Sequence, residues 1–202
     1  MNYPFYSINV HEALDKSNRV YMGESALSIL FDDFSCPKNL EVEHFLKHNA
    51  IEFTKKNQSV THIVLHRSDC GDSLAGYFTL AVKPVSVRAS AISKTMGRKL
   101  SRISVLNKET GTYTASAYLI AQLGKNFSLP KGEQIQGTDL LNLADITVKM
   151  AQHIVGGVVE FLECEDNSFL LDFYTKNGFK MFDRRITDEE EPEELIQLLR
   201  FI

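Results

Sequence analysis

The pattern of hydrophobic and polar positions divides the first part of the chain into short strands and one amphipathic helix. "FYSINV" alternates weakly and predicts a first strand. Across residues 38–57, apolar side chains recur at helical spacing with polar ones opposite, which predicts a helix. "THIVLHR" and "SLAGYFTLAVKP" predict two strands joined by a turn around "SDCGD". Pro84 is expected to end the second strand, because proline cannot donate to a sheet ladder.

The second part of the chain reads as strand, long helix, strand, helix and strand, with "LIQLLRFI" a last strand or helix. "TYTASAYLIAQLG" is rich in β formers and predicts a buried central strand. "TDLLNLADITVKMAQHI" predicts the long helix, and "NSFLLDFYTKN" a shorter helix with Asn167 as its N-cap and Gly178 past its end. The expected buried face of the long helix consists of Leu140, Leu141, Ala144, Val148, Ala151 and Ile154.

This order of elements predicts the fold class. A strand–helix–strand crossover implies parallel pairing, whereas the earlier hairpin implies antiparallel pairing. We therefore expect an α/β (α+β) fold, with a mixed central sheet of about six to seven strands and helices on both faces. The sequence has no repeats and no low-complexity linker, so residues 1–202 are expected to form a single domain.

Composition narrows the class of protein. With 202 residues, 44% hydrophobic and 24% charged, the chain has the profile of an ordinary globular protein. It shows neither a bilayer-spanning apolar run nor a signal peptide, so we expect a cytoplasmic protein without a membrane partner. The three cysteines, Cys36, Cys70 and Cys164, lack CxxC spacing and are expected to be reduced.

Charge is unevenly distributed along the chain. The net charge of −4 argues against a polyanion binder as a whole, yet Lys83–Lys108 contains seven Lys or Arg and no acid. Asp183–Glu194 carries seven acids against two arginines. Two interpretations stay open: solvated faces of opposite sign, or a basic platform beside an active site.

Histidines and the loop "SLPKGEQIQGTDLLNLA" are the other candidate features. The pairs His44/His48 and His62/His66 lack a third ligand, so no metal site is predicted. The loop, residues 128–144, leads into the long helix, and backbone N–H groups at such a turn form an anion trap. The residues alone leave open whether it binds phosphate or only caps the helix.

"NSFLLDFYTKNGFKMF" resembles the last conserved block of the GNAT superfamily of acyl-CoA N-acyltransferases, through Asn167, Leu170, Tyr174, Gly178 and Phe179. "YLIAQLGKN" resembles the family's central strand, and "EQIQGTDLL" its pyrophosphate loop, where Gln134 and Gly137 match. Asp139 departs from the pattern, since a small residue is expected there. "DFSCPKNLEVEHFLKHNAIEFTKKN" is similar to the opening helices of a branch that includes toxin-like acetyltransferases acting on aminoacyl-tRNA.

The resemblance implies acetyl-CoA as cosubstrate. Leu123, Gly124 and Lys125 would pair with the pantetheine arm, and N–H groups of residues 135–139 would cradle the pyrophosphate. The full set of expected cofactor-binding residues is Leu123, Gly124, Lys125, Gln134, Ile135, Gln136, Gly137, Thr138 and Asn167.

The resemblance to the GNAT superfamily also implies that an amine attacks the thioester directly. Tyr174 is the candidate general acid that protonates the leaving thiolate. Glu163 is a candidate general base, with a water chain as the alternative, and Cys164 is interpreted as a buried thiol rather than a nucleophile.

The acceptor and the class of protein remain open at this stage. A small amine, a protein amine and aminoacyl-tRNA are alternative acceptors, and the sequence indicates no antitoxin partner. A homodimer is compatible with the sequence. The chain could also be a non-catalytic acyl-CoA-binding module that retains the fold, or a structural domain without a cofactor.

Overall fold

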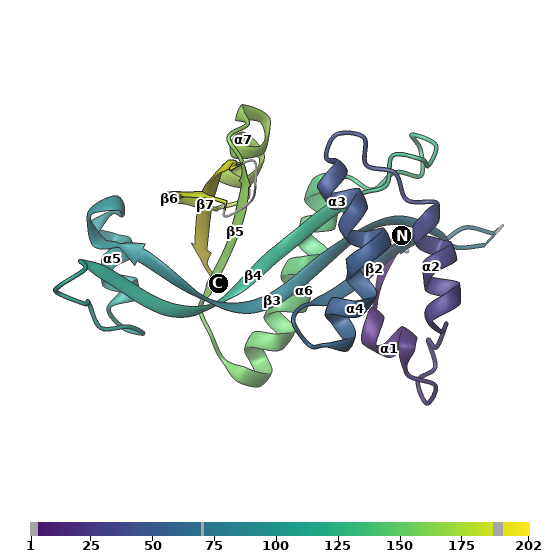
Figure 1. Cartoon of the computed structure of the whole chain (residues 1–202), viewed down its shortest axis with the longest axis horizontal. Helices are drawn as coiled ribbons and strands as arrows, with labels where there is room; N and C mark the ends of the chain where they lie inside the picture. The colour runs from purple at the N-terminus through teal and green to yellow at the C-terminus, as the bar shows by residue number, and fades with distance from the viewer. Residues whose placement is uncertain (1–3, 70, 188–191) are drawn as a thin grey trace. The chain divides into compact units, whose positions relative to one another are not determined.

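The computed structural model describes residues 4–69, 71–187 and 192–202 (Figure 1). They form two compact units: the first contains the chain up to Ala81 and Ile120–Met150, the second Val82–Leu119 and Ala151–Ile202. The strands form a seven-stranded mixed sheet in the order β1-β2-β3-β4-β5-β7-β6, which confirms the predicted fold class. Strands β3 and β4 and helix α6 run from one unit into the other, and the single domain stays a prediction.

The first unit is built on an antiparallel sheet. Strand β1 (Phe5–Asn9) pairs with β2 (Val60–His66), and β2 pairs with β3 (Ser73–Arg88). The predicted helix over residues 38–57 is one helical run with a π-helical turn in its middle. The helical elements are α1 (Val10–Leu14), α2 (Glu24–Asp32), α3 (Leu40–His44), the π turn Phe45–Asn49, α4 (Ala50–Lys55) and α6 (Gly137–Val155).

Alternation along the strands of this unit fills two cores, one on each face of the sheet. Ile63 and Tyr77 point into a core that contains Leu27 of α2 and Leu46 of the π turn. Their strand neighbours Val64 and Phe78 point the other way and pack with Leu140 and Ala144 of α6. Helices on both faces are therefore confirmed for this unit.

The expectation that Pro84 ends its strand is wrong, because β3 continues to Arg88. The register of β2 with β3 ends at Val60↔Leu80. Beyond Leu80 this edge of β3 has no β2 residue opposite it, and proline is tolerated where a strand has such a free edge.

The second unit contains the parallel pair of the sheet. Strands β4 (Thr112–Lys125) and β5 (Val159–Glu165) pair in parallel at Tyr118↔Glu160 and Leu119↔Phe161, as the crossover through α6 predicts. Strand β7 pairs antiparallel with both β5 and β6, so the C-terminal segment is a strand rather than a helix. The other elements are the 3₁₀ turn Ala89–Ala91, α5 (Lys94–Leu100), α7 (Ser168–Lys176), β6 (Lys180–Ile186) and β7 (Glu194–Phe201).

Helix α6 follows the predicted amphipathic pattern except at its end. Leu140, Leu141, Ala144 and Val148 are buried, whereas Ile154 is 80% exposed. The buried stripe stops before the last turn, so Ile154 does not belong to the core face. In the part of the chain that the structure describes, no helix has both the length and the apolar character that a bilayer span requires.

Candidate functional site

The end of β4 is fixed by close packing around Gly124. A Cβ on this residue would lie 2.6 Å from the Tyr77 ring and 2.6 Å from Cγ1 of Val42. The Tyr77 hydroxyl donates to the Val42 carbonyl at 2.6 Å, which ties α3 to β3 beside this glycine. Burial raises the pKa of Tyr77, so its hydroxyl stays a donor. Gly124 is therefore required for packing, whatever it binds.

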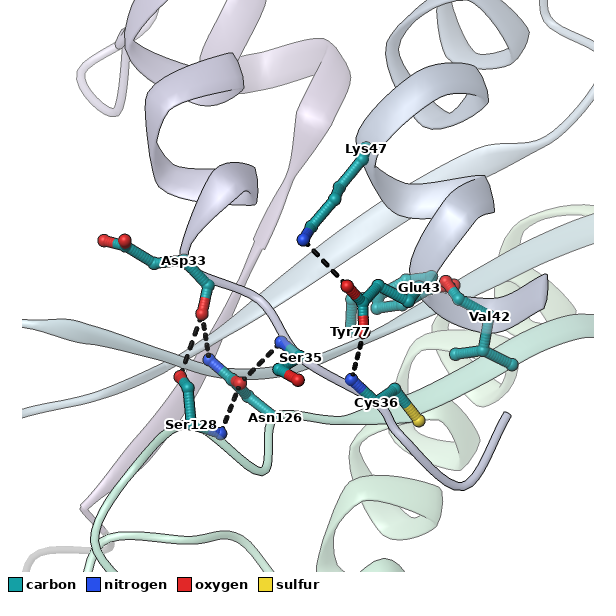
Figure 2. Close-up of polar contacts among 9 residues, drawn as sticks. All are labelled: Asp33, Ser35, Cys36, Val42, Glu43, Lys47, Tyr77, Asn126 and Ser128. Carbon is teal, nitrogen blue, oxygen red and sulfur yellow. Dashed lines mark hydrogen bonds and ion pairs between the residues drawn. The ribbon is translucent and has the colours of Figure 1, made fainter. Parts of the chain in front are cut away.

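Asn126 holds the segment that follows β4. Its side-chain carbonyl accepts from the N–H groups of Ser35 and Ser128, both at 3.0 Å (Figure 2). Its amide donates to the carbonyl of Leu74 at 2.8 Å and to that of Asp33 at 3.4 Å. A side chain with 1% exposure thus joins three stretches of chain, a role that its place in the sequence did not suggest.

Glu43 anchors the loop between α2 and α3. Its carboxylate accepts from Lys47 at 2.9 Å and from the backbone N–H of Cys36 at 2.7 Å (Figure 2). These hydrogen bonds lower the pKa of Glu43, the one from Lys47 most. The loop beside the end of β4 is therefore held from two sides, by Glu43 and by Asn126.

The N–H groups of β4 alternate between its two edges. The Asn126 N–H bonds the carbonyl of Ala75 in β3 at 2.9 Å, so the N–H of Lys125, and by alternation that of Leu123, point to the opposite edge. Within the described residues, the pairing of β4 with β5 covers Tyr118 and Leu119.

The start of α6 contains the loop residues of the candidate site. Ile135 is fully buried in the core beneath α6, and the Gln134 amide donates to the Leu129 carbonyl at 2.7 Å, so both stabilise the loop itself. The Gln136 carbonyl accepts the first helical hydrogen bond, from Leu140.

The first N–H groups of α6 precede the Leu140 N–H, which makes the first helical hydrogen bond. Among the hydrogen bonds of the described residues, the N–H groups of Gly137, Thr138 and Asp139 have no acceptor. Three such groups at a helix N-terminus present a positive potential to an anion. Asp139 lies in this first turn, where a carboxylate favours the helix dipole.

In the second unit, Tyr174 is buried near the end of α7. It packs edge-to-face on Phe173 and Phe179, with ring centroids 5.0 and 5.8 Å away. Burial, and next the charge of the neighbouring Cys164, raise the pKa of the Tyr174 hydroxyl. In the part of the chain that the structure describes, this hydroxyl makes no hydrogen bond. Tyr174 is thus a protonated donor at neutral pH.

Asn167 is confirmed as the N-cap of α7. Its side-chain oxygen accepts from the N–H groups of Phe169 at 2.9 Å and Leu170 at 3.4 Å. Gly178 has φ +89° just past the helix end, as predicted for a C-terminal glycine. A contact of Asn167 with a cofactor stays a prediction.

Glu163 is held in an ion pair on the sheet. Its carboxylate accepts from Arg185 Nη2 at 2.7 Å, from Arg185 Nε at 3.0 Å and from Gln197 at 2.7 Å. Burial raises the pKa of Glu163, but these hydrogen bonds outweigh it, and the net pKa lies below the ordinary value. An engaged carboxylate of low pKa is a weak base, so the geometry gives the proposed base role no support.

Cys164 is a free, buried thiol, as the sequence predicts. Burial, followed by the charges of Glu165 and Asp166, raises the pKa of the Cys164 thiol to about 11, which keeps it protonated. The rings of His44 and His48 lie 4.5 Å apart. Over residues 4–69, 71–187 and 192–202, no group of three potential ligands that could hold a metal ion occurs. Cys70 lies outside the described residues.

The basic segment Lys83–Lys108 comprises the end of β3, helix α5 and the loop before β4. Arg88 pairs with Asp183, and Lys99 lies over the ring of Phe201 at 4.9 Å. Its other cations show no acidic partner among the described residues: Lys83, Lys94, Arg98, Arg102 and Lys108. Part of the acidic segment, residues 188–191, lies outside the described residues.

No family model and no curated protein matches the chain. Solved structures do match. AtaT complexed with acetyl-methionyl-tRNAfMet is 18% identical, with 95% of this chain and 93% of that chain covered and a TM-score of 0.61. A KacT mutant is 17% identical, with 96% and 94% covered and a TM-score of 0.63. AtaTR bound with AcCoA is 16% identical, with 98% and 93% covered and a TM-score of 0.58. The chain therefore has the GNAT fold, in the form found in AtaT and KacT.

Proposed function

We propose that this protein is an N-acetyltransferase that moves an acetyl group from acetyl-CoA to a primary amine. The observation that carries the proposal is the start of α6, where three N–H groups have no acceptor among the described residues. The pyrophosphate of acetyl-CoA is an anion of the kind that such a helix terminus binds. The likeness to AtaTR bound with AcCoA supports this cosubstrate.

The backbone of β4 supplies the second contact with the cosubstrate. N–H groups of Leu123 and Lys125 point away from β3 and would pair with the amide-rich pantetheine arm, as an added strand does. Gly124 lies between them, where its missing side chain lets Tyr77 and Val42 approach. These residues, with Gln134–Thr138 and Asn167, are the proposed cofactor-binding set.

The reaction follows from direct attack. The amine nitrogen bonds to the thioester carbon, a tetrahedral oxyanion forms, and the carbon–sulfur bond then breaks. The Tyr174 hydroxyl donates its proton to the leaving thiolate, a role that its uncommitted hydroxyl supports. We assign no protein side chain as general base. The attacking nitrogen loses its proton to water, the alternative to Glu163, and the Tyr174 phenolate regains a proton from solvent.

Replacing Tyr174 with Phe separates an enzyme from a non-catalytic acyl-CoA-binding module. The Tyr174→Phe enzyme is expected to lose about 10²-fold or more in kcat while acetyl-CoA still raises its melting temperature. Unchanged transfer would remove Tyr174 as the acid. A wild-type protein that binds acetyl-CoA but transfers nothing to any amine would favour the binding module.

Aminoacyl-tRNA is the acceptor that one further observation favours. The basic segment carries five cations without an acidic partner among the described residues, and phosphate backbones bind such surfaces. AtaT, which shares the fold, has been seen with acetyl-methionyl-tRNAfMet. Small amines and protein amines remain the competing acceptors, and assaying all three with one enzyme preparation decides among them.

A further inference from the structure

The C-terminal end of α7 forms a Schellman motif that includes Tyr174. The Phe179 N–H donates to the Tyr174 carbonyl at 3.1 Å, and the Gly178 N–H donates to the Thr175 carbonyl at 3.0 Å. The apolar contact that usually accompanies this motif joins the same two residues, Tyr174 and Phe179. The position of the Tyr174 ring thus depends on where Phe179 lies.

Arg200 of β7 holds both parts of this motif. Its guanidinium lies over the Phe179 ring, 4.2 Å from the centroid, and its Nη1 donates to the Asn177 carbonyl at 2.9 Å. Asn177 is the C-cap residue of α7, where helical carbonyls lack partners and a cation is favourable. One side chain therefore fixes the helix end and the ring on which Tyr174 packs.

Glu160 of β5 in turn holds Arg200. The Arg200 Nε donates to the Glu160 carboxylate at 2.6 Å, and the Glu160 side chain has no exposed surface. The two residues are directly opposite in the register of β5 with β7. A buried, hydrogen-bonded pair of this kind defines one geometry more strictly than an exposed ion pair does.

We infer that Glu160 and Arg200 are positioning residues for Tyr174, so that the buried pair sets the catalytic geometry of the hydroxyl through Phe179 and the end of α7. This inference rests on the proposed function, in which Tyr174 is the general acid. A misplacement of about 1 Å can cost a large part of the rate, whereas the cosubstrate contacts of β4 and α6 do not involve this pair.

The test combines Arg200 variants with Tyr174→Phe in a double-mutant cycle on kcat. Arg200→Lys keeps the charge beside Glu160 but removes the planar stacking and the fork geometry. We expect it to lower kcat about tenfold and to leave KM for acetyl-CoA unchanged. In the Tyr174→Phe background the same change is expected to cost nothing further, because the group it positions is gone.

Two further variants keep the test decisive. Glu160→Met with Arg200→Met removes the pair without leaving a lone buried charge, so it provides a folded protein if Arg200→Lys unfolds. Arg184→Gln is the matched control: it breaks the exposed ion pairs with Asp166 and Glu194 in the same unit and should not alter kcat.

The outcomes separate this inference from the proposed function. The positioning role would be overturned if the effects of Arg200→Lys and Tyr174→Phe on kcat multiplied independently, or if a folded Arg200 variant had an unchanged kcat. Tyr174 would remain the proposed general acid in both cases. Full activity of Tyr174→Phe would overturn the proposed general acid itself.

Discussion

At the scale of single residues, the end of β4 depends on the absence of a side chain at Gly124. Tyr77 and Val42 occupy the space that a Cβ would need. A buried tyrosine that bonds the backbone of α3 cannot move away without losing that hydrogen bond. The glycine is thus explained by packing before any ligand is considered.

Gly124→Ala should lower the free energy of unfolding by about 1–3 kcal/mol, the usual cost of overpacking. Urea denaturation measures it. Gly132→Ala is the control, because a Cβ there meets nothing within 4 Å and the residue has no left-handed φ. Equal midpoints for the two variants would show that the contact around Gly124 relaxes without cost.

The Glu163–Arg185 pair predicts a pH dependence of stability. The folded-state pKa of Glu163 lies below its unfolded value, so the pair's contribution is present above the unfolded pKa and is lost as pH falls through the folded pKa. The stability gap between wild type and Glu163→Gln should therefore be largest near neutrality and shrink in acid. A gap that stays constant from pH 7 down to pH 3 would contradict the assigned shift.

At the scale of elements, α7 shows which features a sequence can reveal. Asn167 and Gly178 were predicted as caps because their chemistry is local: an amide that accepts from the next turn, and a glycine that adopts a left-handed φ. Asn126, Glu160 and Arg200 were not identified, because their partners come from distant segments. A buried polar residue directly after a strand, as in "GKNF", is the one local signal that could have pointed to Asn126.

Two glycine substitutions in helical elements are expected to act in opposite directions. Gly178→Ala should destabilise the protein by about 1–2 kcal/mol, because the Cβ of alanine is sterically unfavourable at a left-handed φ. Gly97→Ala, inside α5 and with its nearest contact 4.0 Å away, should stabilise by about 0.5–1 kcal/mol. Thermal unfolding of both variants checks the signs, and a stabilised Gly178→Ala would refute the Schellman geometry.

At the scale of the whole molecule, the mixed pairing of the sheet followed from the alternation of strands and helices, whereas the sequence did not predict the order of the strands. The path of β3 past Pro84 did not, since it depends on where β2 stops. Tyr174 came from a family resemblance, and the structure adds its burial and its packing partners. The sequence offered Glu163 as a candidate general base. Arg185 and Gln197 hold its carboxylate in hydrogen bonds, so the structure gives that role no support.

Reversing charge in the basic segment tests the acceptor. Changing Lys94, Arg98 and Arg102 together to Glu should weaken tRNA binding. It should also make the slope of log affinity against log salt concentration shallower, by the amount that roughly three phosphate contacts contribute. The rise in melting temperature with acetyl-CoA should not change, because the proposed cosubstrate contacts on β4, in residues 134–138 and at Asn167 all lie outside the basic segment. Unaltered acetylation of aminoacyl-tRNA at all salt concentrations would exclude this segment as its binding surface.

Calorimetric titration with acetyl-CoA tests the central claim, binding at the start of α6, most directly. Gly137→Pro removes one N–H at a helix position that tolerates proline, and Gly137→Ala keeps that N–H. The account predicts wild-type binding that Gly137→Ala retains and that Gly137→Pro weakens about tenfold, the value of one charge-assisted hydrogen bond. No heat from the wild-type protein at millimolar acetyl-CoA, or equal affinity of the two variants, would contradict it.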